Sequence, residues 1–392
     1  MAIQDSDLIR ALDRRGQKSS IAEVRVPLKR ARHVPSEIYY SQEIFDLEKE
    51  RIFMKDWLCV ARIEEVEKPG DYMTLRIMGE PVLIARDDAG SLRAFRNMCA
   101  HRGVEVANGA GCAKEFSCPY HGWRYDLAGR LTGAPFMNEN ELFNAEKSGL
   151  SELKLGTWAG WIFINFDTGC GPLMERIGEF ANDLAFLKME DCRLASKFRI
   201  ELDCNWKLVV ENLLDVYHVA VLHGGSFGKY RGAAEKQQLF MRKQGGTFTA
   251  YTSAPMLPGG KTLFQNMPAI ADRGPNFAVS SHLAPNFQVI TRSDNCHPQL
   301  MWPATPTTSY FDIYILFPKE FFAERDFEHR VKLYRDYMQY ALEEDRTMIA
   351  SLQRAMESRH YSPGLMSKLE VSIHHLLNDY LDRLFGPNGG PR

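Results

Sequence analysis

The sequence predicts an α+β protein in which an antiparallel β-domain precedes a second domain that combines a sheet with helices. Between residues 58 and 170, short runs rich in Val, Ile, Leu and aromatic residues alternate with turn signals such as KPG, MGEP and LAGR. Further β-like runs lie between residues 247 and 318, and a long helical pattern follows from about 324 to 358. Strands followed by a mixture of sheet and helices are typical of this fold class.

Composition excludes several classes of protein. The chain has 392 residues with 48 basic and 50 acidic side chains, so its formal net charge is −2 and favours neither nucleic acid nor an anionic membrane. Its eight cysteines are too dispersed for a disulfide scaffold. Because there is no apolar run of about 18 residues and the first residues form no hydrophobic leader, we expect a cytoplasmic protein.

The expected elements can be placed in chain order from their periodicity and punctuation. They are a polar arm over 1–35, a helix within 36–57, a β-domain ending near 174, a strand at 198–207, and helices over 209–223, 324–358 and 368–385. Apolar residues recur at helical spacing after Ser41, which is a suitable N-cap. Residues 127–130 (LAGR) are expected to form a hairpin turn, and we place the start of the second domain at 175.

Two short pairs of metal-ligand residues lie in predicted loops of the β-domain. Cys99 and His101 form the first pair, and Cys118 and His121 form the second after 16 intervening residues. Zinc fingers usually place two cysteines in one pair and two histidines in the other. A [2Fe-2S] cluster with two cysteines on one iron and two histidines on the other can take one of each from each loop. A tetrahedral zinc site and buried structural cysteines beside paired histidines remain alternatives.

A second group of ligand residues lies in the expected helix over 209–223. Glu211, Asp215 and His218 are four and three residues apart, so a regular helix would place them on one face. His223 follows His218 by five residues and converges with it only if the helix ends there, which Gly224 and the glycine after it favour. The alternative is a helix whose polar residues are paired with distant partners.

The helical pattern over 324–358 supplies a third ligand. Its apolar stripe runs through Met338, Ala341, Ile349 and Leu352, and position 345 at the centre of the stripe is Asp. Glu344 is rotated about 100° from that stripe, so we expect it to face elsewhere. Two histidines and one carboxylate form the facial triad of non-haem Fe(II) oxygenases, although zinc hydrolases use a similar set. We call His218, His223 and Asp345 the triad.

These motifs together resemble the large, catalytic (alpha) subunit of Rieske non-haem iron oxygenases of the aromatic-ring-hydroxylating type. The resemblance extends from about residue 36 to 385 and is carried by CAHRG at 99–103, CPYHGWRYDLAGRL at 118–131, NWK at 205–207, ENLLDVYHVAVLH at 211–223, and EED at 343–345 with Gln353 downstream. It implies a Rieske [2Fe-2S] domain over 36–174 after an arm at 1–35, and a mononuclear iron domain with a helix-grip antiparallel sheet over 175–392.

The resemblance also implies roles for individual residues. Cys99 and Cys118 would hold one iron of the cluster, and His101 and His121 the other, while the triad would bind a mononuclear Fe(II). Respiratory Rieske proteins have an additional disulfide, and the corresponding positions here are Val104 and Tyr120. We therefore expect the lower-potential type of cluster that supplies electrons to oxygenases.

Partners and a route for electrons follow from the same resemblance. The candidate catalytic residues are Asp215, expected to link His218 with the partner subunit's His121, and Asn212, which matches an Asn near the iron in relatives. A head-to-tail homotrimer or an α3β3 oligomer would bring unlike metal centres of neighbouring subunits together. NAD(P)H would supply electrons through a separate reductase, with or without a ferredoxin, and O2 would be the cosubstrate.

The substrate is the least defined of these predictions. We expect hydroxylation or oxidative demethylation of a small aromatic or aromatic-acid substrate. The alternatives are oxidation of a quaternary ammonium or N-methyl compound, or a Rieske electron-transfer protein that is not an oxygenase. Apolar candidates for the substrate pocket, for which ordinary core packing is the competing interpretation, are Leu213, Val219, Phe227, Phe264, Met267 and Phe287.

Overall fold

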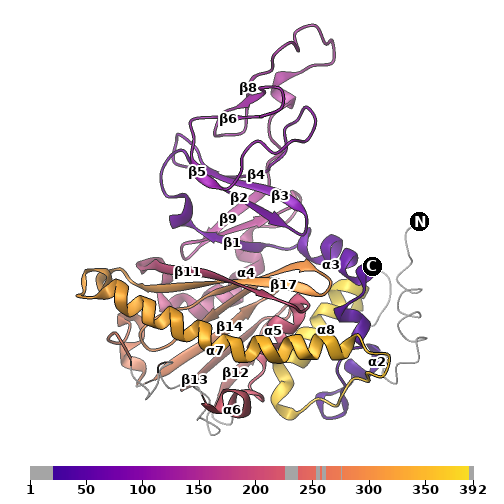
Figure 1. Cartoon of the computed structure of the whole chain (residues 1–392), viewed down its shortest axis with the longest axis vertical. Coiled ribbons are helices and arrows are strands. Elements are labelled where there is room, and N and C mark those ends of the chain that lie inside the picture. Colours follow the sequence, from indigo (N-terminus) through magenta and orange to yellow (C-terminus); the bar gives the residue numbers. More distant parts are fainter. Residues whose placement is uncertain (1–20, 226–236, 253–256, 258–261, 275, 388–392) are drawn as a thin grey trace. The chain divides into compact units, whose positions relative to one another are not determined.

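A computed structural model describes residues 21–225, 237–252, 257, 262–274 and 276–387, and it divides the chain into two compact units (Figure 1). The smaller unit is Phe53–Arg176, and the larger unit combines the described residues up to Ile52 with those from Ile177 onward. The helix expected within 36–57 begins in the larger unit, whereas most of the predicted arm lies outside the described residues. No described helix has the length and apolar character needed to cross a bilayer.

The smaller unit is built from antiparallel strands, as the sequence predicts. Its sheets have the orders β1-β10-β9, β4-β3-β2-β5 and β6-β7-β8. The strands are β1 (Leu58–Arg62), β2 (Asp71–Ile77), β3 (Glu80–Arg86), β4 (Leu92–Arg96), β5 (Ala110–Cys112), β6 (Phe116–Ser117), β7 (Arg124–Tyr125), β8 (Leu131–Gly133), β9 (Lys154–Trp158) and β10 (Trp161–Asn165). The expected turn at 127–130 joins β7 to β8, where Gly129 has a φ of 80°.

The larger unit contains one seven-stranded antiparallel sheet. Its order is β11-β17-β16-β15-β14-β13-β12, so the first and last strands along the chain pair near one edge. The strands are β11 (Cys192–Leu202), β12 (Gln238–Met241), β13 (Thr247–Thr252), β14 (Phe277–Leu283), β15 (Phe287–Ile290), β16 (Gln299–Thr305) and β17 (Thr308–Pro318). The strand expected at 198–207 begins earlier, at Cys192, because its register with β17 extends over the whole strand.

Helices cover this sheet, and the long α7 crosses it in Figure 1. The α-helices are α2 (Ile21–Val24), α3 (Gln42–Glu48), α4 (Leu173–Leu184), α5 (Trp206–Leu214), α6 (Val219–Leu222), α7 (Phe327–Met356) and α8 (Val371–Phe385). Ser41 caps α3 by accepting the Ile44 N–H, as predicted. The buried stripe of α7 includes Asp345, but Gln353 occupies its last turn in place of Leu352, which is 40% exposed.

The prediction of one continuous helix over 209–223 is wrong. Helix α5 ends at Leu214, Asp215 has an extended conformation, and α6 begins only at Val219. The Asp215 Oδ1 atom accepts the N–H of Tyr217 at 2.6 Å. This local hydrogen bond gives the backbone an alternative to the helical one, which is how Asp commonly ends a helix. Glu211 is therefore separated from Asp215 and His218, and it lies in a different buried cluster.

That buried cluster attaches α5 to its neighbouring helices. The Glu48 carboxylate at the end of α3 accepts hydrogen bonds from Lys207 Nζ at 2.5 Å, Trp206 Nε1 at 2.8 Å and Tyr380 Oη at 2.6 Å. A buried ion pair is tolerated only when such additional hydrogen bonds satisfy it. At the start of α5, the side chain of Gln353 on α7 accepts a backbone N–H at 2.9 Å. These contacts fix the direction in which α5 leads into the segment of the triad.

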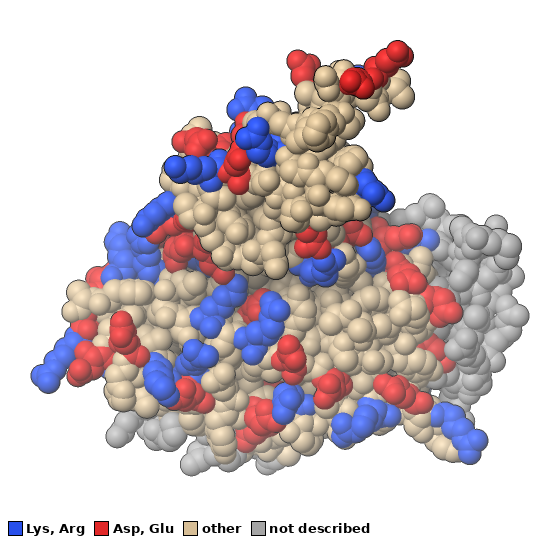
Figure 2. Space-filling model, turned by 45° about the horizontal axis from the view of Figure 1, so that its top comes forward, with Lys and Arg blue, Asp and Glu red and all other residues tan. Residues whose placement is uncertain are grey.

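Surface charge is mixed in sign. In Figure 2, acidic and basic side chains are interspersed over the face shown, and neither sign forms an extended patch there. This distribution agrees with the formal net charge of −2. Long-range attraction to a polyanion has no basis on that face.

The buried Glu211 carboxyl predicts a pH-dependent stability. Burial raises its pKa to about 7 from a reference value of 4.5, while Tyr39 donates a hydrogen bond to it at 2.7 Å. The folded chain thus binds a proton that the unfolded chain loses, and the stability from this proton is present below pH 4.5 and lost as the pH rises through 7. Glu211→Gln, which stays neutral, should gain stability relative to the parent chain across this interval in urea unfolding. Exposed Glu320→Gln is the control, and parallel pH profiles for all three proteins would contradict the prediction.

Candidate functional site

Two loops of the smaller unit have the same backbone turn, and we call residues 99–103 and 118–122 the Rieske loops. The Gly103 N–H donates to the Cys99 carbonyl at 2.8 Å, and the Gly122 N–H donates to the Cys118 carbonyl at 3.0 Å. Both glycines have positive φ values, 77° and 71°, which other L-residues rarely adopt. Equivalent turns therefore place one cysteine and one histidine on each of two facing loops.

The four side chains divide into a buried pair of sulfurs and an exposed pair of imidazoles. Cys99 and Cys118 are 2% and 3% exposed and form no disulfide. His101 and His121 are exposed, with their Nδ1 atoms 3.1 Å apart. Among the described residues, the only cluster of three or more His, Cys, Asp or Glu ligand atoms suited to a single ion is the triad. The loops thus bring together two cysteines and two histidines, which is the donor set that a Rieske cluster uses.

Two aromatic residues that the sequence analysis did not single out support this donor set. The Tyr125 hydroxyl accepts the Ala100 N–H at 3.0 Å and forms a hydrogen bond with Cys99 Sγ at 3.2 Å. Burial, and then the hydrogen bond with Cys99, raise the pKa of Tyr125, which keeps the hydroxyl protonated. Trp123 stacks on His101 with ring centroids 5.1 Å apart. Both residues follow Cys118 within the same motif, so their position in the motif was the available signal.

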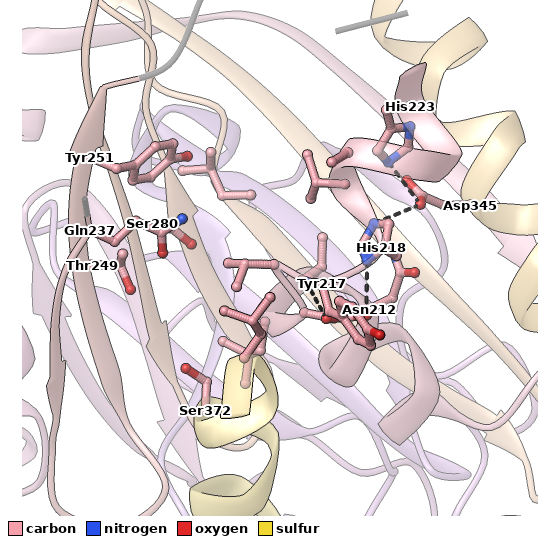
Figure 3. Close-up of a pocket in the computed structure, with 18 of the residues that line it drawn as sticks. Asn212, Tyr217, His218, His223, Gln237, Thr249, Tyr251, Ser280, Asp345 and Ser372 are labelled. Atoms are coloured by element: carbon pink, nitrogen blue, oxygen red, sulfur yellow. Dashed lines mark hydrogen bonds and ion pairs between the residues drawn. The ribbon is translucent and has the colours of Figure 1, made fainter. Parts of the chain in front are cut away.

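The triad converges in the larger unit (Figure 3). Asp345 Oδ1 lies 3.4 Å from His218 Nε2 and 3.1 Å from His223 Nε2. His218 precedes the single turn of α6, and His223 begins the 3-10 turn His223–Gly225 that ends it. Helix α6 thus ends at Leu222, just before His223, and the predicted glycine stop lies in the 3-10 turn that follows. Asp345 Oδ1 is buried and has no hydrogen-bond donor of adequate geometry, which fits a site for a dication.

A carboxylate lies behind each histidine of the triad. His218 Nδ1 is 3.1 Å from Asp215 Oδ2, and His223 Nδ1 is 2.8 Å from Glu344 Oε2. Such carboxylates hold the proton on Nδ1 and leave the Nε2 lone pair for a metal. The expectation that Glu344 faces elsewhere is therefore wrong. The long Glu344 side chain extends from the side of α7 to His223 Nδ1. The His223 imidazole thus contacts α7 twice, through Glu344 at Nδ1 and through Asp345 at Nε2.

The charges of the triad are adjusted to one another. Burial lowers the pKa of His218, but the hydrogen bond with Asp215 and the close approach of the Asp345 carboxylate outweigh this effect and raise the pKa to about 9. Burial raises the pKa of Asp345, and the two histidines beside it outweigh this and lower it to about 2. These shifts favour an ionised Asp345 beside a protonated His218 at neutral pH. A dication would take the place of that proton, so metal binding is coupled to proton release.

The triad opens into a cavity of about 350 Å³ in the larger unit. Asn212, Leu213 and Val219 line it, as the sequence analysis expects for the latter two. The other predicted lining residues do not line the cavity: Phe264, Met267 and Phe287 belong to the buried core instead, so the expectation is wrong for these three. The last candidate, Phe227, lies outside the described residues. In Figure 3 the wall opposite the triad has polar groups, among them the Tyr251 hydroxyl.

Comparisons with known proteins can now be set beside this geometry. The family model described as the ring hydroxylating alpha subunit (catalytic domain) matches residues 189–386, and that of the Rieske [2Fe-2S] domain matches residues 56–152. The chain belongs to the ring-hydroxylating alpha subunit family. Its Rieske domain precedes its catalytic domain, and these domains bind the predicted cofactors, a [2Fe-2S] cluster and a mononuclear iron.

Proteins named for different activities are similar to the chain. The carnitine monooxygenase oxygenase subunit of Acinetobacter pittii is 40% identical over 194 residues, which cover 49% of this chain and 52% of that protein. The chloroplastic choline monooxygenase of Arabidopsis thaliana is 26% identical over 374 residues, 90% of this chain and 82% of that protein. The chlorobenzene dioxygenase subunit alpha of a Cupriavidus species is 37% identical over 201 residues, 49% of this chain and 44% of that protein. The chain thus matches about half the length of the carnitine monooxygenase subunits.

Solved structures share the fold over most of the chain. A quaternary ammonium Rieske monooxygenase has a TM-score of 0.77 at 28% identity, covering 91% of this chain and 95% of that one. Naphthalene 1,2-dioxygenase from a Rhodococcus species has a TM-score of 0.75 at 20% identity, covering 91% of this chain and 95% of that one, which shows a common fold alone. Proteins with this fold are thus named for chemically different substrates, so the fold does not identify the substrate of this chain and the residues of the cavity must be considered.

Removal of Asp345 should remove the mononuclear iron. We expect Asp345→Ala to contain no such iron while retaining its [2Fe-2S] cluster, measured by iron analysis and electron paramagnetic resonance. Glu344→Gln is the matched variant on the same helix, and it should bind iron roughly 10- to 100-fold more weakly because Glu344 supports the ligand His223 and is not itself a ligand. Complete iron loss from Glu344→Gln with normal iron in Asp345→Ala would reverse the two roles.

Removal of His101 should have the opposite effect. We expect His101→Ala to lose the Rieske paramagnetic resonance signal while the mononuclear iron remains, because the cluster would lack one of its four ligands. His329→Ala, which replaces another exposed histidine, should leave both metal centres intact. A retained Rieske spectrum in His101→Ala would contradict the assignment of the loop ligands.

Proposed function

We propose that the chain is a terminal oxygenase component that uses O2 and electrons from NAD(P)H, delivered by a reductase, to oxidise a small organic substrate. The observation that carries this proposal is the presence in one chain of an electron-carrier donor set and a buried triad that opens into a cavity. An electron-transfer protein without oxygenase activity would not need the second site. Iron bound by the triad would supply dioxygen activation, and the cluster would supply single electrons.

Each set of residues has a separate task in this proposal. Cys99 and Cys118 hold the buried side of the cluster, and His101 and His121 expose its other side to electron exchange. The triad would hold the iron, which would supply dioxygen activation next to the substrate cavity that it faces. Asp215 and the carboxylate behind His223 keep both imidazoles oriented, so the metal geometry does not have to form during turnover.

The substrate remains a choice between two classes. The sequence analysis favours a small aromatic or aromatic-acid substrate, which would be hydroxylated or oxidatively demethylated. A quaternary ammonium or N-methyl compound is the second candidate, and it is supported by the similarity to a carnitine monooxygenase oxygenase subunit and to a choline monooxygenase. A panel of aromatic acids, aryl ethers and betaines distinguishes the classes by oxygen uptake coupled to NADH consumption through an added Rieske reductase. If no member stimulates uptake in fully metallated enzyme, the oxygenase proposal fails.

Partners and assembly complete the proposal. We infer a homotrimer or an α3β3 oligomer, a reductase with or without a ferredoxin, and a cytoplasmic location. Asp215 would connect His218 with the partner subunit's His121. Its side chain is 20% exposed, and each of its oxygens already accepts one hydrogen bond within the chain. A carboxylate oxygen accepts two bonds, so Asp215 retains capacity for the partner. Asn212, which lines the cavity, is proposed to act beside the iron.

The proposed bridge gives a separate prediction. Asp215→Asn should retain its [2Fe-2S] cluster and, compared at matched iron content, lose at least about 10-fold in reductase-supported turnover, because an amide holds the His218 proton and the proposed contact with the partner subunit's His121 less well than a carboxylate does. Asp203→Asn is the control, since Asp203 is exposed and lies just before α5. Turnover is measured as substrate-dependent oxygen uptake with matched iron content. Normal turnover by Asp215→Asn would remove this residue from the electron path.

A further inference from the structure

One basic side chain in the cavity has no anionic partner among the described residues. Arg292 is 8% exposed and lines the cavity that opens onto the triad. Its Nη1 donates to the Tyr251 hydroxyl at 3.1 Å, while its Nε is buried without any hydrogen-bond partner. A buried guanidinium with unused donors costs free energy unless an anion satisfies it. Its position in the cavity therefore indicates a ligand rather than a structural ion pair.

The sheet places Arg292 on the wall opposite the triad. Residues that pair across neighbouring strands point to the same face, and here Thr249 pairs with Ser280, which pairs with Ile290. All three line the cavity, as does Arg292 two residues after Ile290. Figure 3 shows Tyr251 and Ser280 across the cavity from the histidines of the triad. The cavity thus has a metal-binding wall and a cationic, hydroxyl-bearing wall.

Neighbouring groups leave the charge of Arg292 in place. His297 also lines the cavity, and burial together with the charge of Arg292 lowers its pKa well below the ordinary value, so its imidazole is neutral. Its Nδ1 lies 3.2 Å from the Asn295 side-chain oxygen. Gln299 Oε1, on the same wall, is buried without a partner and has no charge. Arg292 is the only Lys or Arg among the described residues that line the cavity.

We propose that Arg292 and Tyr251 bind the carboxylate or sulfonate group of the substrate, so that this enzyme acts on a small organic anion or zwitterion. No described residue accepts a hydrogen bond from the Nε and Nη2 edge of the guanidinium, and this edge has the geometry to pair with the two oxygens of such a group. Because the Tyr251 oxygen accepts from Arg292, its O–H remains available as a further donor. An anion held on this wall would direct the other end of the molecule towards the triad. This inference rests on the proposed oxygenase function and narrows its substrate class.

Matched ligands test the inference without any mutation. Binding to the fully metallated enzyme is measured by calorimetry without oxygen, with benzoate against benzamide and γ-butyrobetaine against its primary amide. The acid of at least one pair should bind roughly 10- to 100-fold more tightly than its amide, which is the range of a charge-assisted hydrogen bond. The pair that responds identifies an aromatic acid or a betaine. Equal affinities for acid and amide in both pairs would overturn the inference.

Variants then assign the effect to Arg292. Arg292→Gln should remove the preference for the acid, Arg292→Lys should retain part of it, and Tyr251→Phe should weaken acid binding by a few-fold. The control is Arg199→Gln, which removes the same charge from β11, where Arg199 pairs with Asp312 at 2.7 Å outside the cavity. Full acid affinity in a folded Arg292→Gln enzyme would overturn the inference. If that variant does not fold, Arg292→Lys and the matched ligands decide.

Turnover separates this inference from the function on which it rests. Arg292-dependent acid binding without oxygen uptake would support the anion site and count against the oxygenase proposal. Oxygen uptake with a neutral substrate, unchanged in Arg292→Gln, would support the oxygenase and overturn the anion site.

Discussion

The arrangement of the triad in the larger unit depends on one buried carboxylate. Asp345 occupies the apolar stripe of α7, where a leucine would pack with less electrostatic cost. Its cost is offset only because His218 and His223 reach it from a separate segment. Several other features follow from that requirement. Helix α5 must end before His218, α6 must end at His223, and α5 must be anchored firmly enough to direct the segment that carries both histidines.

Both metal centres obtain their support from residues that lie close to the ligands in sequence. Asp215 is three residues before His218, Glu344 is adjacent to Asp345, and Tyr125 is four residues after His121. A short segment of chain thus carries both a metal ligand and a second residue, which supports that ligand or a ligand on another segment. Such an arrangement lets two distant parts of the fold form a site with few long-range constraints on side-chain angle.

Much of this arrangement could be predicted from the sequence, and the failures have physical causes. The ligand pairs, the antiparallel smaller unit and the buried face of α7 follow from spacing and periodicity. The break after Leu214 was missed because helical periodicity does not register the side chain of Asp215 bonding to its own backbone. Glu344 was misplaced because angular position on a helix ignores the reach of a long side chain. Arg292 could not be found at all, since its burial in the cavity and unused donors depend on strands far apart in the chain.

The division of the chain bears on the order in which its parts acquire structure during synthesis. The smaller unit is contiguous from Phe53 to Arg176, whereas the larger unit needs segments from both sides of it. Glu48 and Arg25 are synthesised long before their ion-pair partners, which are Lys207 and, near the C-terminus, Asp382. Domains fold as units while the ribosome elongates the chain, and long-range pairing is slow. The smaller unit can therefore be complete while the first helices of the larger unit are still without their partners.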